Sequence, residues 1–160
     1  MTLREGLTLG FAALLALAGC GPGGEASQTV LDFTRALADS SYDTAWNLLT
    51  PQTHQLYDST VVLLHKFGWT EARDAANRIA GEMTREEFES LTGKDLFVRL
   101  IRASGDPSEL STTVESVTYP DSGVAAVVLD TDEGLQTIVA RRIEGEWLVD
   151  LTSLEPPIER

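Results

Sequence analysis

The sequence predicts an α+β domain, in which an N-terminal helical layer packs on a C-terminal antiparallel meander of four strands. Three features indicate this class. Apolar residues recur at helical spacing between residues 28 and 103, and they alternate with polar residues between 114 and 151. Segments rich in Gly, Pro, Asp and Ser separate the alternating stretches, as turns separate antiparallel strands. Residues 28–160 are therefore expected to form one domain, and a chain of this length can bury a substantial core.

A short apolar leader precedes this domain. Residues 6–18 contain no charged side chain. A membrane-spanning helix needs about 20 apolar residues, so this stretch is too short to span and suits the apolar part of a secretory signal. Leu17-Ala18-Gly19-Cys20 follows, and Cys20 is the only cysteine. These four residues resemble the lipobox of bacterial lipoproteins.

The resemblance implies that residues 1–19 are a signal peptide and that Cys20 carries a diacylglyceryl group and usually an amide-linked acyl chain. Two or more acyl chains hold a protein stably on a membrane. Gly21 stands where an Asp would favour retention at the inner membrane, so the pattern is typical of anchoring in the outer membrane, facing the periplasm. Residues 20–27, rich in Gly, are predicted to be the lipidated cysteine and a flexible tether.

The charge balance excludes some partners. The chain has 12 basic and 25 acidic residues, a net charge of −13. Nucleic-acid phosphates and anionic lipid headgroups both repel such a surface. We therefore expect no nucleic-acid binding, and we expect the lipid on Cys20 to be the contact with the membrane.

The helical half divides at small residues and capping signals. Thr50-Pro51 predicts a capped helix start, Thr84 to Glu87 is a capping box, and Gly81 and Gly93 end helices. The helices are predicted at 28–38, 43–49, 51–67, 71–80, 85–92 and 94–103. In the third of these, the predicted buried stripe consists of Leu56, Tyr57, Thr60, Leu63, Leu64 and Phe67.

The C-terminal half predicts strands at 114–119, 124–131, 135–143 and 146–151. Glu144-Gly145 is expected to form a two-residue hairpin turn that pairs Ala140 with Val149. A three-residue loop at 132–134 would pair Val128 with Ile138. The face beneath the helices would then hold Val124, Ala126, Val128, Ile138, Ala140, Trp147, Val149 and Leu151.

The opposite sheet face is predicted to hold Ala125, Val127, Leu129, Val139 and Leu148, beside Arg141 and Asp150. An apolar second face needs cover. Two alternatives remain open for that cover: a second copy of the chain, giving a homodimer through the sheet, and the chain's own helices or its tail, residues 154–160.

A second resemblance rests on residues 28–51. A first helix, a small-residue break and Tyr42-Asp43-Thr44-Ala45-Trp46-Asn47-Leu48-Leu49-Thr50-Pro51 resemble the opening of nuclear transport factor 2-like domains. The resemblance implies a helical layer over a curved sheet, a cone with a pocket, and dimers through the sheet. Residues 69–103 depart from it, because that fold has fewer helical residues before its sheet.

His54, Asp58 and His65 form the one cluster of acid–base residues at a useful spacing. At about 100° per residue, offsets of four and eleven place all three within about 40° of helix surface. His54 oriented by Asp58 would be a general base in a pocket, whereas the alternative is a solvated helix face. Trp46 and Trp69 are candidates to line an apolar pocket or to pack in the core.

No sequence pattern for a metal, phosphate or dinucleotide is present, so we expect no metal and no cofactor. The sequence predicts a lipid-anchored cell-envelope protein with a non-catalytic binding or accessory role toward a protein or small apolar ligand. Two alternatives stay open: an enzyme that uses His54 and Asp58 in a cone pocket, and a purely structural envelope lipoprotein.

Overall fold

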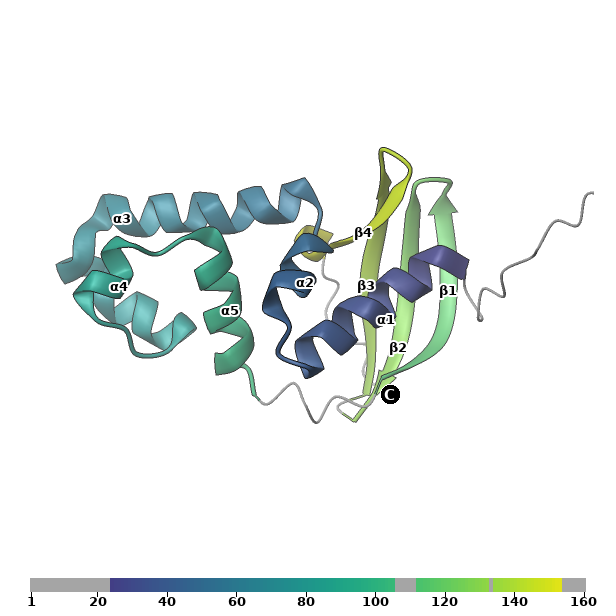
Figure 1. Ribbon diagram of the computed structural model, residues 1–160, viewed down its shortest axis with the longest axis horizontal. Helices are drawn as coiled ribbons and strands as arrows, with labels where there is room; N and C mark the ends of the chain where they lie inside the picture. Colours follow the sequence, from purple (N-terminus) through teal and green to yellow (C-terminus); the bar gives the residue numbers. More distant parts are fainter. Residues whose placement is uncertain (1–23, 106–111, 133, 154–160) are drawn as a thin grey trace, which may run out of the picture.

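The computed structural model describes residues 24–105, 112–132 and 134–153. Helices are followed by a four-stranded antiparallel sheet in the order β1-β2-β3-β4, which confirms the coarse class. Figure 1 shows α1 across one face of the sheet and α3, α4 and α5 extending beside it. The helices are α1 (Gly24–Ala38), α2 (Tyr42–Asn47), α3 (Pro51–Ala80), α4 (Arg85–Glu89) and α5 (Gly93–Ala103). The strands are β1 (Thr113–Asp121), β2 (Val124–Thr131), β3 (Gly134–Ile143) and β4 (Glu146–Asp150), followed by the 3₁₀ turn η2 (Leu151–Ser153).

Helix α1 begins four residues earlier than the sequence predicts. Gly24–Ser27 was assigned to the tether, but these residues are helical, and Ala26 and Ser27 are buried. Within the first turn, the Ser27 hydroxyl donates to the carbonyl of Gly24 at 2.8 Å. The reason is packing, because Ala26 extends the buried stripe of Val30 and Phe33 by one turn. The leader and Cys20 lie outside the described residues.

Helix α3 joins two helices that the sequence predicts separately. Thr50 caps its start by accepting from the Thr53 amide at 3.2 Å, as predicted. The helical path breaks at Gly68, where φ is 74° and ψ is 166°. A side chain is disfavoured at this positive φ, which glycine adopts at little cost. The kink therefore comes from one glycine, between the predicted segments 51–67 and 71–80.

The predicted buried stripe of α3 is only partly correct: Leu64 is buried as predicted, but the buried face is rotated about the helix axis from the predicted one. The first half of the helix buries Thr53, Val61 and Leu64, whereas Leu56 and Phe67 point to solvent. Leu63, also predicted to be buried, is exposed as well. The apolar residues of this segment surround the helix on several sides, so periodicity alone did not select the face that packs.

The position of α5 explains this rotation. A Cβ placed on Gly93, the first residue of α5, would lie 2.2 Å from Asp58 Oδ1 and 2.8 Å from the Asp58 backbone nitrogen. Only glycine permits such close approach of two backbones. Because α5 begins against α3 at this point, the neighbouring side of α3, which carries Val61, turns inward, whereas Asp58 lies at the edge of this contact and stays exposed.

Helices α4 and α5 start at capping boxes. Thr84 and Glu87 form the predicted one, and Thr92 and Asp95 form a second. The predicted helix 85–92 is shorter than expected, because Thr92 serves as the cap of α5 and the chain must leave the helical path before it.

The sheet register is partly as predicted. Ala140 pairs with Val149 across the Glu144-Gly145 turn, which confirms that hairpin. In the preceding hairpin, Val127 pairs with Ile138, so the predicted pairing with Val128 is off by one residue. Side chains alternate along a strand, so this one-residue error inverts both faces of β2.

The turn before β3 causes the difference. Gly134 is the first residue of β3 and pairs with Thr131, whose hydroxyl donates to the Gly134 carbonyl at 2.7 Å. Counting Gly134 as part of the loop shifted the predicted register. Ala125, Val127, Leu129 and Thr131 are consequently buried, while the β2 residues that alternate with them are half-buried.

Two hydrophobic cores result. The sheet core lies between α1, α5 and the sheet, and the helical core lies among α3, α4 and α5. The sheet core contains Ala26, Val30, Phe33, Ala36, Leu37, Ala45, Leu49, Phe97, Ala125, Val127, Leu129, Ala140 and Val149. The helical core contains Val61, Leu64, Ala72, Ala76, Ala80, Met83, Phe88, Leu91 and Leu96.

Candidate functional site

His54 fastens α3 to the end of α2. Its ring stacks on the Trp46 ring, with centroids 4.2 Å apart and an angle of 17° between the planes. Its Nε2 lies 2.8 Å from the carbonyl oxygen of Trp46. A carbonyl only accepts hydrogen bonds, so this nitrogen carries the proton. The ring is half-buried by these contacts, and this arrangement gives His54 a structural role.

His65 makes the corresponding contact with α4. Its Nε2 lies 2.7 Å from the carbonyl oxygen of Phe88, and the two rings meet edge to face at 5.2 Å. The Phe88 side chain is buried, whereas the His65 residue itself remains exposed. Both histidines thus anchor the part of α3 before Gly68 to neighbouring helices, each through a backbone carbonyl.

The sequence predicted His54, Asp58 and His65 on one helix face, as a possible catalytic group or a solvated surface. They do share a side of α3, but that side is turned toward α2, α4 and α5. No hydrogen bond joins His54 to Asp58 among the described contacts, and Asp58 instead packs against Gly93. The structure therefore brings the three residues to separate contacts: His54 is half-buried, whereas Asp58 and His65 are exposed.

The two candidate tryptophans have different surroundings. Trp46 belongs to an aromatic cluster with His54, Tyr57 and Phe97, with ring centroids 4.2 to 5.9 Å apart. Burial raises the pKa of the Tyr57 hydroxyl in this cluster. Trp69 packs at 5.4 Å on Phe88. Trp69 and His65 both line an open pocket of about 270 Å³ beside the Gly68 kink, together with Gly68, Arg85, Phe88 and Glu89.

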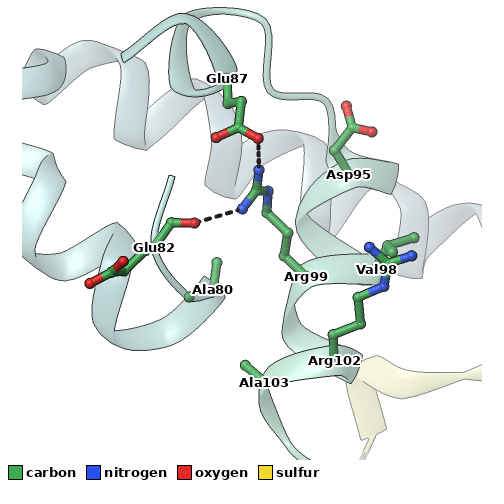
Figure 2. Close-up of a pocket in the computed structure, with 9 residues that line it drawn as sticks. Ala80, Glu82, Glu87, Asp95, Val98, Arg99, Arg102 and Ala103 are labelled. Atoms are coloured by element: carbon green, nitrogen blue, oxygen red, sulfur yellow. Dashed lines mark hydrogen bonds and ion pairs between the residues drawn. The ribbon is translucent and has the colours of Figure 1, made fainter. Parts of the chain in front are cut away.

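A larger pocket, of about 570 Å³, lies between the end of α3, α4 and α5. Figure 2 shows Arg99 at its centre, reaching across to the other two elements. The guanidinium pairs with the Glu87 carboxylate at 2.8 Å and donates to the Glu82 carbonyl at 3.2 Å. The pocket is lined by Ala80, Gly81, Glu82, Glu87, Asp95, Val98, Arg99, Arg102 and Ala103.

The charges of this pocket are mixed. The backbone amide of Thr84 donates to Glu87 at 2.7 Å, and this bond, together with Arg99, lowers the pKa of Glu87. Arg102 lies with its guanidinium carbon 5.0 Å from the centre of the Tyr42 ring, a cation–π contact. Arg99 is held by two partners, so it is positioned before any ligand arrives. A pocket lined by fixed charged side chains suits recognition of a charged, polar group.

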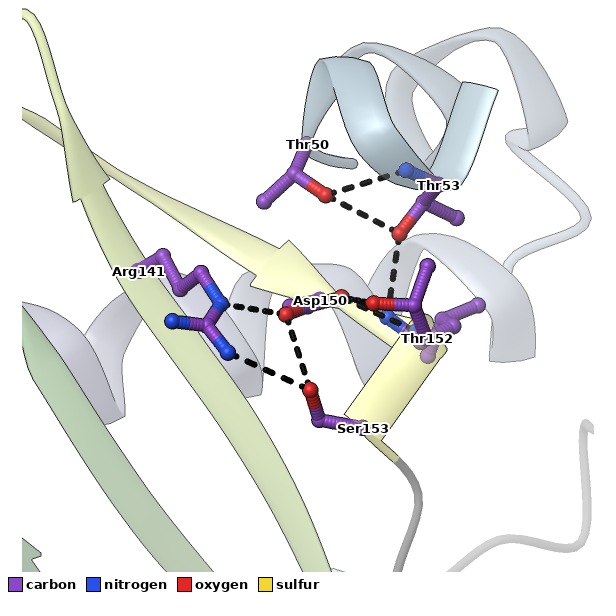
Figure 3. Close-up of polar contacts among 7 residues, drawn as sticks. Thr50, Thr53, Arg141, Asp150, Thr152 and Ser153 are labelled. Atoms are coloured by element: carbon purple, nitrogen blue, oxygen red, sulfur yellow. Dashed lines mark hydrogen bonds and ion pairs between the residues drawn. The ribbon is translucent and has the colours of Figure 1, made fainter. Parts of the chain in front are cut away.

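A second polar cluster joins the end of the sheet to the start of α3 (Figure 3). Arg141 Nε and the Ser153 hydroxyl donate to one oxygen of Asp150, and the Thr152 amide and hydroxyl donate to the other. The Thr53 hydroxyl accepts from the Leu151 amide at 3.0 Å and contacts Thr50. Asp150 is buried, so these donors replace the water that its carboxylate has lost.

The charge state of Asp150 follows from this arrangement. Burial by itself would raise its pKa, but the hydrogen bonds from Thr152, Arg141 and Ser153 outweigh burial and lower the pKa. Asp150 therefore remains ionised at neutral pH with its oxygens occupied. We interpret this cluster as a structural junction, in which the carboxylate holds η2 against β3.

Sequence reasoning missed Arg99, Arg102 and the junction around Asp150. The arginines carried a signal, since two cations lie one turn apart in an acidic chain, but their neighbours come from distant segments.

Among the described residues, no group of three or more His, Cys, Asp or Glu side chains is arranged to hold a metal ion. The described part also contains no helix that is both long and apolar enough to cross a membrane.

Comparisons with known proteins add no relative. No protein-family model matches the chain, and neither a curated protein nor a solved structure matches it.

Proposed function

We propose that this chain is a lipid-anchored cell-envelope protein whose domain has a non-catalytic binding role. The observation that carries the proposal is the sequence Leu17-Ala18-Gly19-Cys20, which ends four residues before α1 begins at Gly24. A lipid on Cys20 would hold the folded part close to the membrane surface. The extended reach of four residues is only about 14 Å.

The domain's charge supports this kind of anchor. A net charge of −13 opposes direct adsorption to anionic lipids, so a covalent lipid would supply the membrane affinity. The geometry of the histidines supports a binding role over catalysis, because His54 and His65 each use Nε2 to hold a backbone carbonyl. The pocket of about 570 Å³ around Arg99, which we call the Arg99 pocket, supplies a preformed polar surface for a ligand or a protein partner.

We further propose a distant kinship with nuclear transport factor 2-like domains. Two features support it: α1 lies across one face of the antiparallel sheet (Figure 1), and the segment after α2 pairs with β4 through Leu49 and Val149. Helices α3 to α5 add a second core to that plan. Association through the outer sheet face, where Val139 and Leu148 are half-buried, belongs to the same proposal.

Replacing Cys20 by Ser tests the anchor. The variant should move from the detergent phase to the aqueous phase in a detergent phase separation, because the acidic domain has no other proposed membrane contact. Gly21→Ser is the matched control, since it alters the next residue and leaves the cysteine; it should stay with the detergent. A Cys20→Ser chain that partitions like the parent contradicts the lipid anchor.

A substitution at Gly21 tests which membrane holds the anchored protein. Gly21→Asp should shift the protein from outer-membrane to inner-membrane fractions on a density gradient, with its lipid intact.

The binding role is tested by extraction in mild detergent, comparing partners recovered with the parent and with Arg102→Ser. Loss of a partner with this variant, at an exposed residue of the pocket and with an unchanged thermal unfolding midpoint, would assign binding to the Arg99 pocket.

A further inference from the structure

The first half of α3 presents an apolar row to solvent. Leu56, Leu63 and Phe67 are 48%, 53% and 57% exposed, and Thr60 lies between them. Their spacing of four, three and four residues is that of the a and d positions of a heptad. At about 100° per residue they share about 60° of the helix surface over about 16 Å. We call Leu56, Thr60, Leu63 and Phe67 the α3 seam.

We propose that the α3 seam binds the same seam of a second copy of this chain, with the two helices antiparallel. The row is symmetric about a point between residues 61 and 62, because Leu56 and Phe67 are equally far from it, as are Thr60 and Leu63. A two-fold axis through that point places Leu56 against Phe67 of the partner subunit, and Thr60 against Leu63 of the partner subunit. A two-fold interface requires this self-complementarity.

The local charge makes the α3 seam a less costly place for a second copy to bind than other surfaces of the chain. Two chains of net charge −13 repel each other, so contact is least costly where charge is absent. Residues 51–70 contain one acidic residue, Asp58, and one basic residue, Lys66. In the antiparallel pair the two Lys66 side chains would be about 13 Å apart along the helices, beyond the screening length of about 8 Å at physiological salt.

The width of the seam argues against a lipid surface as the occupant. Helices that lie in a membrane interface carry a broad apolar face with basic residues on the opposite side, whereas the seam is narrow and borders Gln52, Ser59 and Lys66.

The small area of the seam limits the strength of the dimer. Three large side chains per copy bury less surface than the roughly 1,200–2,000 Å² of a stable complex. We therefore expect a weak dimer, which a shared membrane would favour by raising the local concentration.

Photo-crosslinking in cells tests the proposal on the full chain. A photoreactive residue at position 63 or 67 should give an adduct that contains two differently tagged copies of the protein. Val62 and Ile79 are the matched control positions, because they are 54% and 45% exposed but lie off the seam. They should give at least about five-fold less of this adduct, since a narrow seam leaves them outside the contact.

Two substitutions check the antiparallel register. Leu56→Gln should reduce the adduct from position 67 about five-fold or more, whereas Val62→Gln should leave it within about two-fold; both replace exposed side chains and should preserve the thermal unfolding midpoint. Ser59→Glu should increase the adduct, because it would face Lys66 of the partner subunit. On its own helix, Lys66 is two turns away and cannot reach it.

Three results would overturn the proposal. Equal yields from positions 62 and 63 would mean that the contact is unspecific. An adduct with lipid or with a different protein at position 67, and none with a second copy, would assign the seam to another occupant. Failure of Leu56→Gln to lower the position-67 adduct would exclude the antiparallel pairing even if a dimer forms.

Discussion

The sheet core and the helical core bury apolar surface in different ways. The sheet core has thirteen buried residues, which come from strands and helices far apart in the chain. The helical core has nine, and alanines make up a similar share of both cores. Because the helical core is smaller, each of its large side chains, such as Phe88, contributes a larger share of the apolar surface that it buries. We therefore expect the helical core to depend more on single large side chains than the sheet core does.

Polar contacts also hold the helical side together. His65 bonds to the Phe88 carbonyl, Arg99 joins α5 to Glu87 and Glu82, and two capping boxes fix the starts of α4 and α5. Helix α5 couples the two cores, because Leu96 is buried in one and Phe97 in the other. Damage to one core should therefore reach the other mainly through α5 and the facing half of α3.

Phe88→Ala is the strongest test of this comparison. Phe88 is 2% exposed and contacts both His65 and Trp69, so its truncation should destabilise the protein by about 3–5 kcal/mol, the usual range for a buried aromatic. Amide hydrogen exchange should accelerate most in residues 69–89, while β2 and β3 keep more of their protection. The measurement is native-state exchange together with urea unfolding.

Val127→Ala in the sheet core is the control for Phe88→Ala. It removes less volume, and its exchange effect should centre on β2 and its neighbouring strands. Uniform acceleration throughout the domain in both variants would show that the two cores unfold as one unit and that the proposed difference between them is absent.

Gly93→Ala sharpens the comparison at the contact between α3 and α5. Alanine is normally a better helix residue than glycine, but here its Cβ would lie 2.8 Å from the Asp58 backbone nitrogen. We expect a loss of about 1–3 kcal/mol, the range for overpacking, measured by urea unfolding. Gly123→Ala meets its nearest neighbour at an ordinary 3.5 Å and should cost far less. Equal effects would mean that the helices separate without penalty.

Asp150→Asn tests the polar junction on the sheet side. We expect a loss of about 1–2 kcal/mol at pH 7, because charged hydrogen bonds from Arg141 and the hydroxyls weaken. The native pKa of Asp150 is lowered, whereas the unfolded value is about 3.9. Between these values the unfolded chain binds more protons, so this stabilisation is present above about pH 4 and is lost as the pH falls through the native pKa.

Urea unfolding between pH 7 and pH 2.5 measures this effect. The difference between the parent and Asp150→Asn should shrink in acid, whereas Asp132→Asn, at an exposed residue, should match the parent at every pH. A difference that grows as the pH falls would reverse the assigned direction of the pKa shift.

The order of the elements was predictable from local sequence. Turn residues, Thr50-Pro51 and the Thr84 capping box act over a few residues, and the structure has helices and strands within a few positions of where these signals place them. The Glu144-Gly145 hairpin was likewise predictable, because a two-residue turn fixes its own register. The register of β2 was not, since the pattern did not show whether Gly134 belongs to the loop or to β3.

The face of α3 is the clearest case of a tertiary decision. Apolar residues at 56, 57, 61, 62, 63, 64 and 67 allow several buried faces, and local propensity is the same for each. Gly93 selects among them, because its missing side chain lets α5 approach the Asp58 backbone. The same choice leaves the α3 seam exposed and directs His54 and His65 to backbone carbonyls.

By itself, the sequence determined the α+β class, the acidic surface and the candidate anchor at Cys20, because each is a property of composition or of a contiguous motif. Only the tertiary structure decided which sides of α3 and β2 are buried, that Arg99 meets Glu87 and Glu82, and that Asp150 is surrounded by donors. These contacts join residues from separate elements, and their formation depends on how helices and strands pack rather than on the preferences of any one segment.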